Sequence, residues 1–199
     1  VCYEVADAVE KDFGKCDILV NGAGGNNPRA TTDKEYFEEG DIDADTKSFF
    51  DLDASGVEFV FNLNFLGTLI PTQAFARQMV GREGCNIINI SSMAAHLGFS
   101  EVVPYCVSKS AVCGLTRGLS IEWANDNICV NSIAPGWFPS EMNKQVMTPE
   151  RKAAILARMP VHAFGDTRDL GAMAKFLISD GATYITGQDF AVDGGALAY

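Results

Sequence analysis

Tyr105 and Lys109 are the two residues whose types and spacing most directly suggest catalysis. They lie four positions apart in a stretch with apolar residues at helical spacing, so a helix would place both side chains on one face. An ammonium group beside a phenol favours the phenolate and lowers the tyrosine pKa, which would let Tyr105 exchange a proton near neutral pH. Surface neighbours without any chemistry can show the same spacing, so the pair needs further polar partners.

Ser92 and Asn64 are candidates for those partners. Ser92 follows an expected strand and precedes Tyr105, so its hydroxyl could reach a substrate oxygen that the phenol also contacts. A capping role at a turn is the alternative for this serine. Asn64 lies in an apolar helical run, where a buried amide must be hydrogen-bonded. It is expected to open the helix slightly and to hold a water for proton relay.

Short apolar strands alternate along the chain with amphipathic helices. The expected strands cover residues 17–20, 86–90, 128–133 and 189–192. The expected helices cover residues 1–13, 53–80, 105–125 and 168–179, with a further helix starting at 148. This alternation predicts an α/β fold with a doubly wound parallel sheet, in a single domain over residues 1–199. Ligands bind such sheets beyond the carboxyl ends of the strands, where the candidate residues are expected.

Composition and charge exclude several classes of protein. The 199 residues contain 15 Lys and Arg against 26 Asp and Glu, a formal net charge of −11, and such a surface repels nucleic-acid phosphates. Neither a membrane-spanning run nor a secretory signal is present, so a cytoplasmic protein with scattered thiols rather than disulfides is expected. The histidines, His96 and His162, have no partner at ligand spacing, so no metal site is expected.

Six segments, in the right order, resemble the motifs of the short-chain dehydrogenase/reductase family, and the resemblance spans the whole chain. They are Asn21-Gly22-Ala23-Gly24, Asn64-Phe65-Leu66-Gly67, Ser92 with Tyr105 and Lys109, Asn131 to Gly136, Ile185 to Gln188, and Val192 to Gly195. The resemblance implies a Rossmann-like fold and an enzyme that uses NAD or NADP. It also implies a homodimer or homotetramer with a small-molecule substrate, although Gly114 and Gly118 could serve close packing within one subunit instead.

The resemblance further implies a role for each catalytic residue. Tyr105 would exchange a proton with the substrate oxygen, and Ser92 would orient that oxygen. Lys109 would lower the tyrosine pKa and hold the nicotinamide ribose, while Asn64 would keep the relay water. The residues expected to bind the cofactor are Asn21, Gly22, Ala23, Tyr105, Lys109, Pro135, Gly136, Phe138 and Ser140.

The sequence departs from the family pattern at its start and in one loop. The glycine-rich turn that cradles the pyrophosphate has no counterpart, so the first strand–helix units are expected to be missing from residues 1–199. Residues 26–52 form an expected long acidic loop, whose start is similar to the D-mannonate oxidoreductase and gluconate 5-dehydrogenase group. There Arg29 could clamp a substrate carboxylate or be a solvated loop arginine. His96 is expected in the wall of the substrate cleft.

These features favour an NAD(P)-dependent oxidoreductase that interconverts a secondary alcohol and a ketone on a sugar acid or polyol, with D-mannonate and D-fructuronate as the expected pair. Two alternatives stay open. One is a truncated, non-catalytic module for cofactor binding or oligomerisation. The other is a reductase of 3-oxoacyl thioesters or other carbonyl compounds such as steroids, against which the hydrophilic loop around Arg29 counts.

Overall fold

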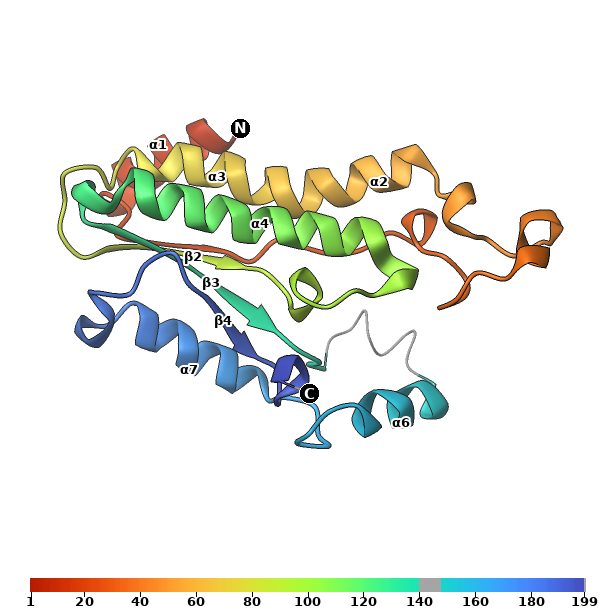
Figure 1. The fold of residues 1–199 in the computed structure, drawn as a ribbon. Coiled ribbons are helices and arrows are strands. Elements are labelled where there is room, and N and C mark those ends of the chain that lie inside the picture. Colours follow the sequence, from red (N-terminus) through yellow and green to blue (C-terminus); the bar gives the residue numbers. More distant parts are fainter. Residues whose placement is uncertain (140–147, 199) are drawn as a thin grey trace.

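A parallel sheet organises the structure, a computed structural model that describes residues 1–139 and 148–198. Within these residues the sheet has four strands in the order β1-β2-β3-β4. The strands are β1 (Ile18–Asn21), β2 (Cys85–Ile90), β3 (Ile128–Pro135) and β4 (Asp189–Val192). All three pairings are parallel, so the chain must cross over after each strand, and helices make the crossovers (Figure 1). The predicted doubly wound, Rossmann-like α/β fold is confirmed.

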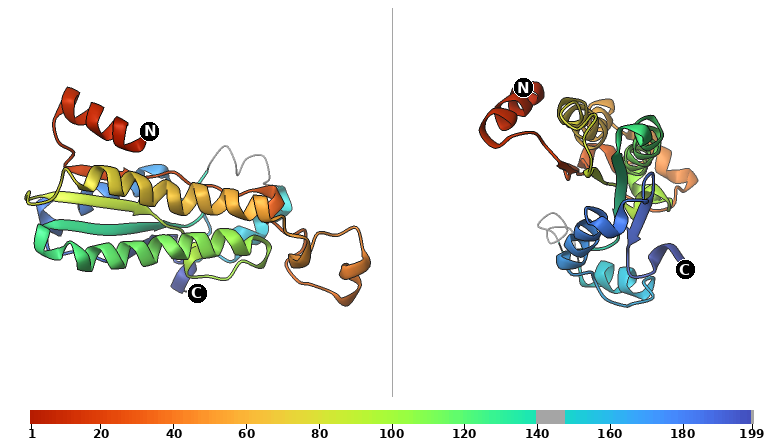
Figure 2. Two further views of the ribbon diagram at one scale, coloured as in Figure 1. Left: turned by 90° about the horizontal axis from the view of Figure 1, so that it is seen from above. Right: turned by 90° about the vertical axis from the view of Figure 1, so that its left-hand side faces the viewer.

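Helices cover both faces of the sheet (Figures 1 and 2). One face carries α2 (Ala54–Phe61), α3 (Gly67–Ala76) and α4 (Val103–Glu122), and α1 (Cys2–Phe13) packs beside α3. The other face carries α7 (Thr167–Leu177), and α6 (Pro149–Ala157) lies beyond it towards the carboxyl ends of the strands. Among the described residues, no helix is both long enough and apolar enough to cross a membrane.

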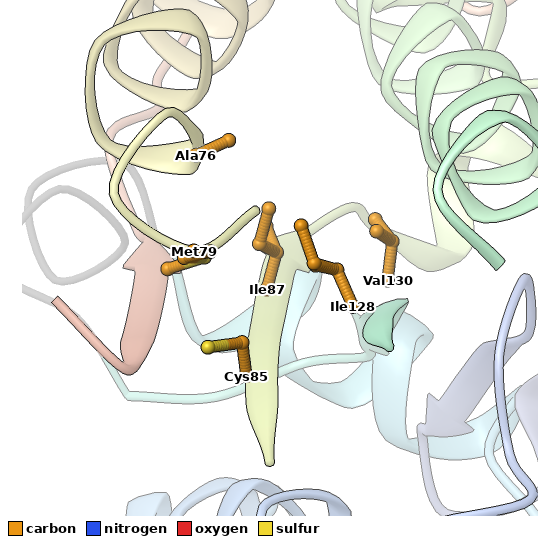
Figure 3. Close-up of a cluster of buried hydrophobic side chains, with 6 residues drawn as sticks. All are labelled: Ala76, Met79, Cys85, Ile87, Ile128 and Val130. Carbon is orange, nitrogen blue, oxygen red and sulfur yellow. The ribbon is translucent and has the colours of Figure 1, made fainter. Parts of the chain in front are cut away.

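Strands β2 and β3 are apolar on both sides because helices pack against both of their faces, whereas Ile18 and Val20 of β1 are 43% and 52% exposed. Figure 3 shows the cluster between the sheet and the α3–α4 side, formed by Ala76, Met79, Cys85, Ile87, Ile128 and Val130. Ile88, the next residue along β2, points to the opposite face and packs with Ile133 and Leu177. Successive strand residues point to opposite faces, which explains why the predicted strands read as continuous apolar runs.

Replacing Ile87 by alanine is expected to lower the free energy of unfolding by about 2–5 kcal/mol. Its side chain is fully buried in the cluster, so the shorter residue loses apolar burial and leaves a cavity. Urea denaturation measures the loss. The control is Ile42→Ala, which removes the same atoms at a position that is 63% exposed and should change stability by less than about 0.5 kcal/mol. Equal effects at the two positions would contradict the assigned core.

Residues 26–52 form a long loop that extends beyond the carboxyl end of β1 (Figure 2). Short 3-10 turns at Pro28–Ala30, Glu39–Asp43 and Phe49–Asp51 give it local order. Lys34 lies between two of its acids, 2.6 Å from Asp41 and 3.0 Å from Glu38. The predicted acidic loop is therefore a folded excursion at the end of the sheet where ligands bind α/β proteins.

Candidate active site

The first turns of α4 bring Tyr105 and Lys109 to the carboxyl ends of β1 and β2. Pro104 lies in the first turn of this helix, where its missing N–H costs no hydrogen bond. Ser92 follows β2, and its hydroxyl accepts a hydrogen bond from the backbone N–H of Ala94 at 3.1 Å. The same side chain lies close enough to Tyr105 to lower the pKa of its phenol. The predicted meeting of Ser92 and Tyr105 is therefore found in the structure, and Ser92 caps the next turn as well.

Burial controls the pKa of Tyr105. It raises the pKa of the phenol, and the nearby Ser92 hydroxyl lowers it by a smaller amount. Burial outweighs the other influences on this pKa, and the lowering expected from Lys109 stays a prediction. Burial also lowers the pKa of Lys109 to about 8, and its ammonium group donates to the backbone oxygen of Ile90 at 2.8 Å. Tyr105 is consequently protonated at neutral pH, the form that can give a proton to a ketone oxygen.

Lys109 is buried between β2 and the glycine turn that follows β1. A Cβ atom on Gly24 would lie 2.8 Å from Nζ of Lys109 and 3.2 Å from Oδ1 of Asn64, so a side chain at this position would displace the Lys109 ammonium group. An ammonium group has three N–H donors, and Ile90 is the one hydrogen-bond acceptor it has among the described residues. The remaining donors can bind hydroxyl groups of a ligand.

Asn64 lies in a π-helical turn, Asn62–Leu66, between α2 and α3. Its amide oxygen accepts from the Gly25 N–H at 2.8 Å, and its amide nitrogen donates to the Gly25 oxygen at 3.0 Å and to the Ser108 hydroxyl at 2.8 Å. The predicted opening of the helix is confirmed, because π-turns widen the helix at such sites. The relay water stays a prediction. Ser108 was missed, since its spacing in the sequence does not link it to Asn64.

The cofactor-binding residues predicted from sequence fall into two groups. Asn21 is buried, and its amide nitrogen donates to Thr72 and Asn89 at 2.8 Å each, so its side chain ties β1 to the core. Gly22, Ala23 and Gly24 are exposed at the end of β1. This open turn beside the buried Lys109 ammonium fits a dinucleotide, whose ribose hydroxyls need donors and whose bulk needs a surface without side chains.

The end of β3 supplies the second part of the predicted cofactor site. Gly136 donates to the Val192 oxygen at 2.9 Å, and a Cβ atom on it would lie 2.6 Å from Cα of Asp193. A side chain at this position would therefore push β4 away. Phe138 packs against Gly165, where a Cβ atom would lie 2.3 Å from its ring. Pro135 ends β3, and Ser140 lies outside the described residues.

The two predicted substrate residues have partners within the protein. Arg29 is mostly exposed, donates to Ser55 at 3.0 Å and lies 4.0 Å from the Asp53 carboxylate. Both the solvated alternative and the carboxylate clamp for Arg29 stay open with this exposure. The Nε2 atom of His96 lies 2.5 Å from Oδ2 of Asp189.

His96 is also close to Cys113, although sequence spacing gave it no ligand partner. The fold brings these side chains together, because α4 contributes Cys113 and the start of β4 contributes Asp189. Both residues were missed. Only the register of β4 on β3, which pairs Asp189 with Ser132, brings Asp189 close to residues that follow β2. A lone aspartate at the start of an apolar strand was the available signal.

Comparisons with known proteins agree with this geometry. A family model described as enoyl-(acyl carrier protein) reductase matches residues 2–196. An uncharacterized oxidoreductase of Haemophilus influenzae is 44% identical over 203 residues, which cover 98% of this chain and 71% of that protein.

Two solved structures are similar over the full length of this chain. One, from Haemophilus influenzae, is assigned as a D-mannonate oxidoreductase and contains NAD; it has 43% sequence identity and a TM-score of 0.93 over 73% of its own chain. The other is a gluconate 5-dehydrogenase from Burkholderia cenocepacia in complex with NADP and tartrate, with 31% identity and a TM-score of 0.85 over 71% of its chain.

Proposed function

Since the chain belongs to the short-chain dehydrogenase/reductase family of NAD(P)-dependent oxidoreductases, we propose that it interconverts a secondary alcohol and a ketone on a sugar acid. In the reducing direction the proposed substrate is D-fructuronate or 5-keto-D-gluconate. The observation that carries the proposal is the convergence of Ser92, Tyr105, Lys109 and Asn64 at the carboxyl ends of β1 and β2. A non-catalytic module would have no need of this set.

Tyr105 is the proposed proton donor to the ketone oxygen. Burial keeps its phenol protonated at neutral pH, and the neighbouring Ser92 hydroxyl can hydrogen-bond the same substrate oxygen. Reduction leaves a phenolate in a buried site, which the adjacent Lys109 ammonium would stabilise by charge. In the oxidising direction the phenolate takes the proton back from the alcohol, so that direction needs a higher pH.

The residues present fit a nicotinamide dinucleotide, which when bound supplies or accepts the hydride. Lys109 would donate to the ribose hydroxyls, and the exposed turn Gly22–Gly24 would lie along the cofactor. Pro135 and Gly136 would form the wall behind the nicotinamide. Asn64 would hold the turn after β1 in place through its hydrogen bonds to Gly25, which fixes the position of this turn relative to Lys109.

The sugar-acid substrate is supported by the relatives and by the loop of residues 26–52. One similar structure is assigned to D-mannonate, and another is a gluconate dehydrogenase holding tartrate, a hydroxy acid. The loop at the same end of the sheet here carries Arg29, whose side chain is 66% exposed and so can reach a carboxylate. The loop also exposes aromatic side chains, among them Phe37, Phe49 and Phe50, so the preference for a sugar acid rests on the relatives and on Arg29, not on the polarity of the loop.

A substrate panel tests the assignment. Rates of NADH and NADPH oxidation by the full-length protein are measured with D-fructuronate, 5-keto-D-gluconate and an acetoacetyl thioester. We expect kcat/KM to be at least about 10²-fold higher for one of the sugar acids, because a site built for hydroxyls and a carboxylate rejects a ligand that leaves them unpaired. Faster reduction of the thioester would replace the substrate assignment, and no turnover of any ketone would favour a non-catalytic module.

A further inference from the structure

Three groups that commonly bind metals meet behind Ser92, outside the set used for proton transfer. They are the His96 imidazole after β2, the Cys113 thiol on α4 and the Asp189 carboxylate at the start of β4, and their ligand atoms all lie within 4.8 Å of one another. Sγ of Cys113 lies 3.2 Å from Oδ2 of Asp189, and Nε2 of His96 lies 2.5 Å from the same oxygen. Three chain segments far apart in sequence are therefore joined at one carboxylate oxygen.

Asp189 is a buried carboxylate without a permanent cation nearby. Its side chain is 9% exposed, and among the described residues its one ion-pair partner is His96. The other neighbours are neutral: the Ser91 hydroxyl, which donates at 2.6 Å, and the Cys113 thiol. Burying a carboxylate away from water is costly unless positive charge or several donors compensate it. The contacts with Ser91, His96 and Cys113 provide this compensation in the free protein, and a divalent cation would add positive charge at the same carboxylate.

Ser132 gives a second, independent indication. It is fully buried on β3 and pairs in register with Asp189. Its hydroxyl is close enough to lower the pKa of the Asp189 carboxyl, yet it has no hydrogen bond of ordinary geometry with any described residue. Buried polar atoms without a partner are uncommon in native proteins. A water bound to a metal ion at Asp189 would give this hydroxyl a partner.

We propose that His96, Cys113 and Asp189 form a binding site for a divalent transition metal ion of the zinc class. Thiolate, imidazole and carboxylate are the ligand types that Zn²⁺ takes, and three protein ligands leave its fourth position for water. Tetrahedral coordination needs ligand atoms about 3–4 Å apart, so His96 and Asp189 must separate by about 1 Å. His96 is 38% exposed and Cys113 is 3% exposed, so the ion would enter past the histidine.

Binding requires one proton to leave. A free cysteine thiol is protonated at neutral pH, whereas the thiolate is the form that binds a metal. On binding, the S–H bond breaks, the proton goes to solvent and the thiolate lone pair forms the bond to the metal. Neutral His96 and ionised Asp189 each donate a lone pair, and nothing is oxidised or reduced.

Cobalt(II) is a suitable probe, because thiolate coordination to Co²⁺ gives a near-ultraviolet charge-transfer absorption. Full-length protein without an affinity tag is freed of metal with a chelator and titrated with CoCl₂ in weak buffer at pH 7. We expect the absorption to saturate at one ion per chain, to release about one proton per ion, and to be lost on adding ZnCl₂. His96→Gln and Asp189→Asn should weaken binding by about 10²-fold.

The two cysteines of α4 provide a matched pair of variants. Cys113→Ser should abolish the absorption, whereas Cys106→Ser, on the same helix, should leave it unchanged, because the Cys106 thiol contacts the Phe99 oxygen instead. Absence of the absorption in the wild-type protein would overturn the proposal, and so would its survival in Cys113→Ser. If Cys113→Ser does not fold, the half-exposed His96→Gln variant decides, since unchanged affinity there would equally exclude the site. None of these readouts depends on dehydrogenase activity.

Discussion

Replacing Tyr105 by phenylalanine is expected to lower kcat/KM for ketone reduction by about 10²–10⁴-fold, the usual contribution of a positioned general acid. The change removes only the phenol oxygen, so the ring still fills its place at the start of α4 and Tm should change little. Initial rates with the best substrate of the panel measure the loss. Tyr184→Phe, which removes the same atom from a fully exposed side chain, should leave the rate unchanged.

The pH dependence gives a second test of Tyr105. Burial raises the pKa of the phenol, so ketone reduction should be supported throughout the neutral range, where the phenol is protonated. Alcohol oxidation needs the phenolate, and its rate should rise with pH. Tyr105→Phe should lose this rise together with the rate. Turnover within a few-fold of wild type in Tyr105→Phe would show that another group carries the proton.

Replacing Lys109 by methionine is expected to reduce activity and to increase stability. Loss of charge-assisted hydrogen bonds to the cofactor and of the charge beside Tyr105 should lower kcat/KM by about 10²-fold. Stability should rise, because the folded protein holds a buried ammonium whose pKa is lowered from 10.5 to about 8. That pKa difference corresponds to a loss of about 3 kcal/mol from the free energy of unfolding of the wild type. Removing the hydrogen bond to Ile90 costs the variant about 1 kcal/mol in return. The variant should therefore be more stable by about 2 kcal/mol at pH 7.

The pH dependence of this stability difference identifies its cause. Below pH 8 the wild-type protein carries the full cost of burying the charge. Between pH 8 and 10.5 Lys109 loses its proton in the folded protein before it does so in the unfolded chain, so the wild type gains stability and the advantage of the variant shrinks. Urea denaturation at several pH values measures this. Lys175→Met, at an exposed position, should show no such trend, and a pH-independent difference at Lys109 would contradict a buried charge.

The sequence predicted those features that depend on local order. Tyr105 and Lys109 share a helix face because their spacing matches the helical repeat, and Ser92 follows β2 because an apolar run ends just before it. Asn64 was recognised as a polar residue in an apolar helix, and the π-helical turn is the distortion that its hydrogen bonds to Gly25 require. The parallel sheet also followed, since short apolar strands that alternate with helices are joined by helical crossovers.

Features that depend on distant contacts could not be predicted. The pKa of Tyr105 reflects its burial in the folded protein, which the spacing to Lys109 does not reveal. Cys113 and Asp189 meet His96 only through the packing of α4 and the register of β4. Arg29 has its contacts with Asp53 and Ser55 because the loop folds back onto the start of α2, and residue spacing does not reveal such a return.

The most direct measurement is the fate of the hydride in a single turnover. Full-length protein is mixed with D-fructuronate and with NADH or NADPH that carries deuterium at both C4 positions, and the product is examined by mass spectrometry and NMR. An oxidoreductase of this class should place one deuterium on the carbon of the new hydroxyl group for each cofactor oxidised. A saturating cofactor with no deuterated alcohol, from this ketone or from 5-keto-D-gluconate, would contradict the proposed function.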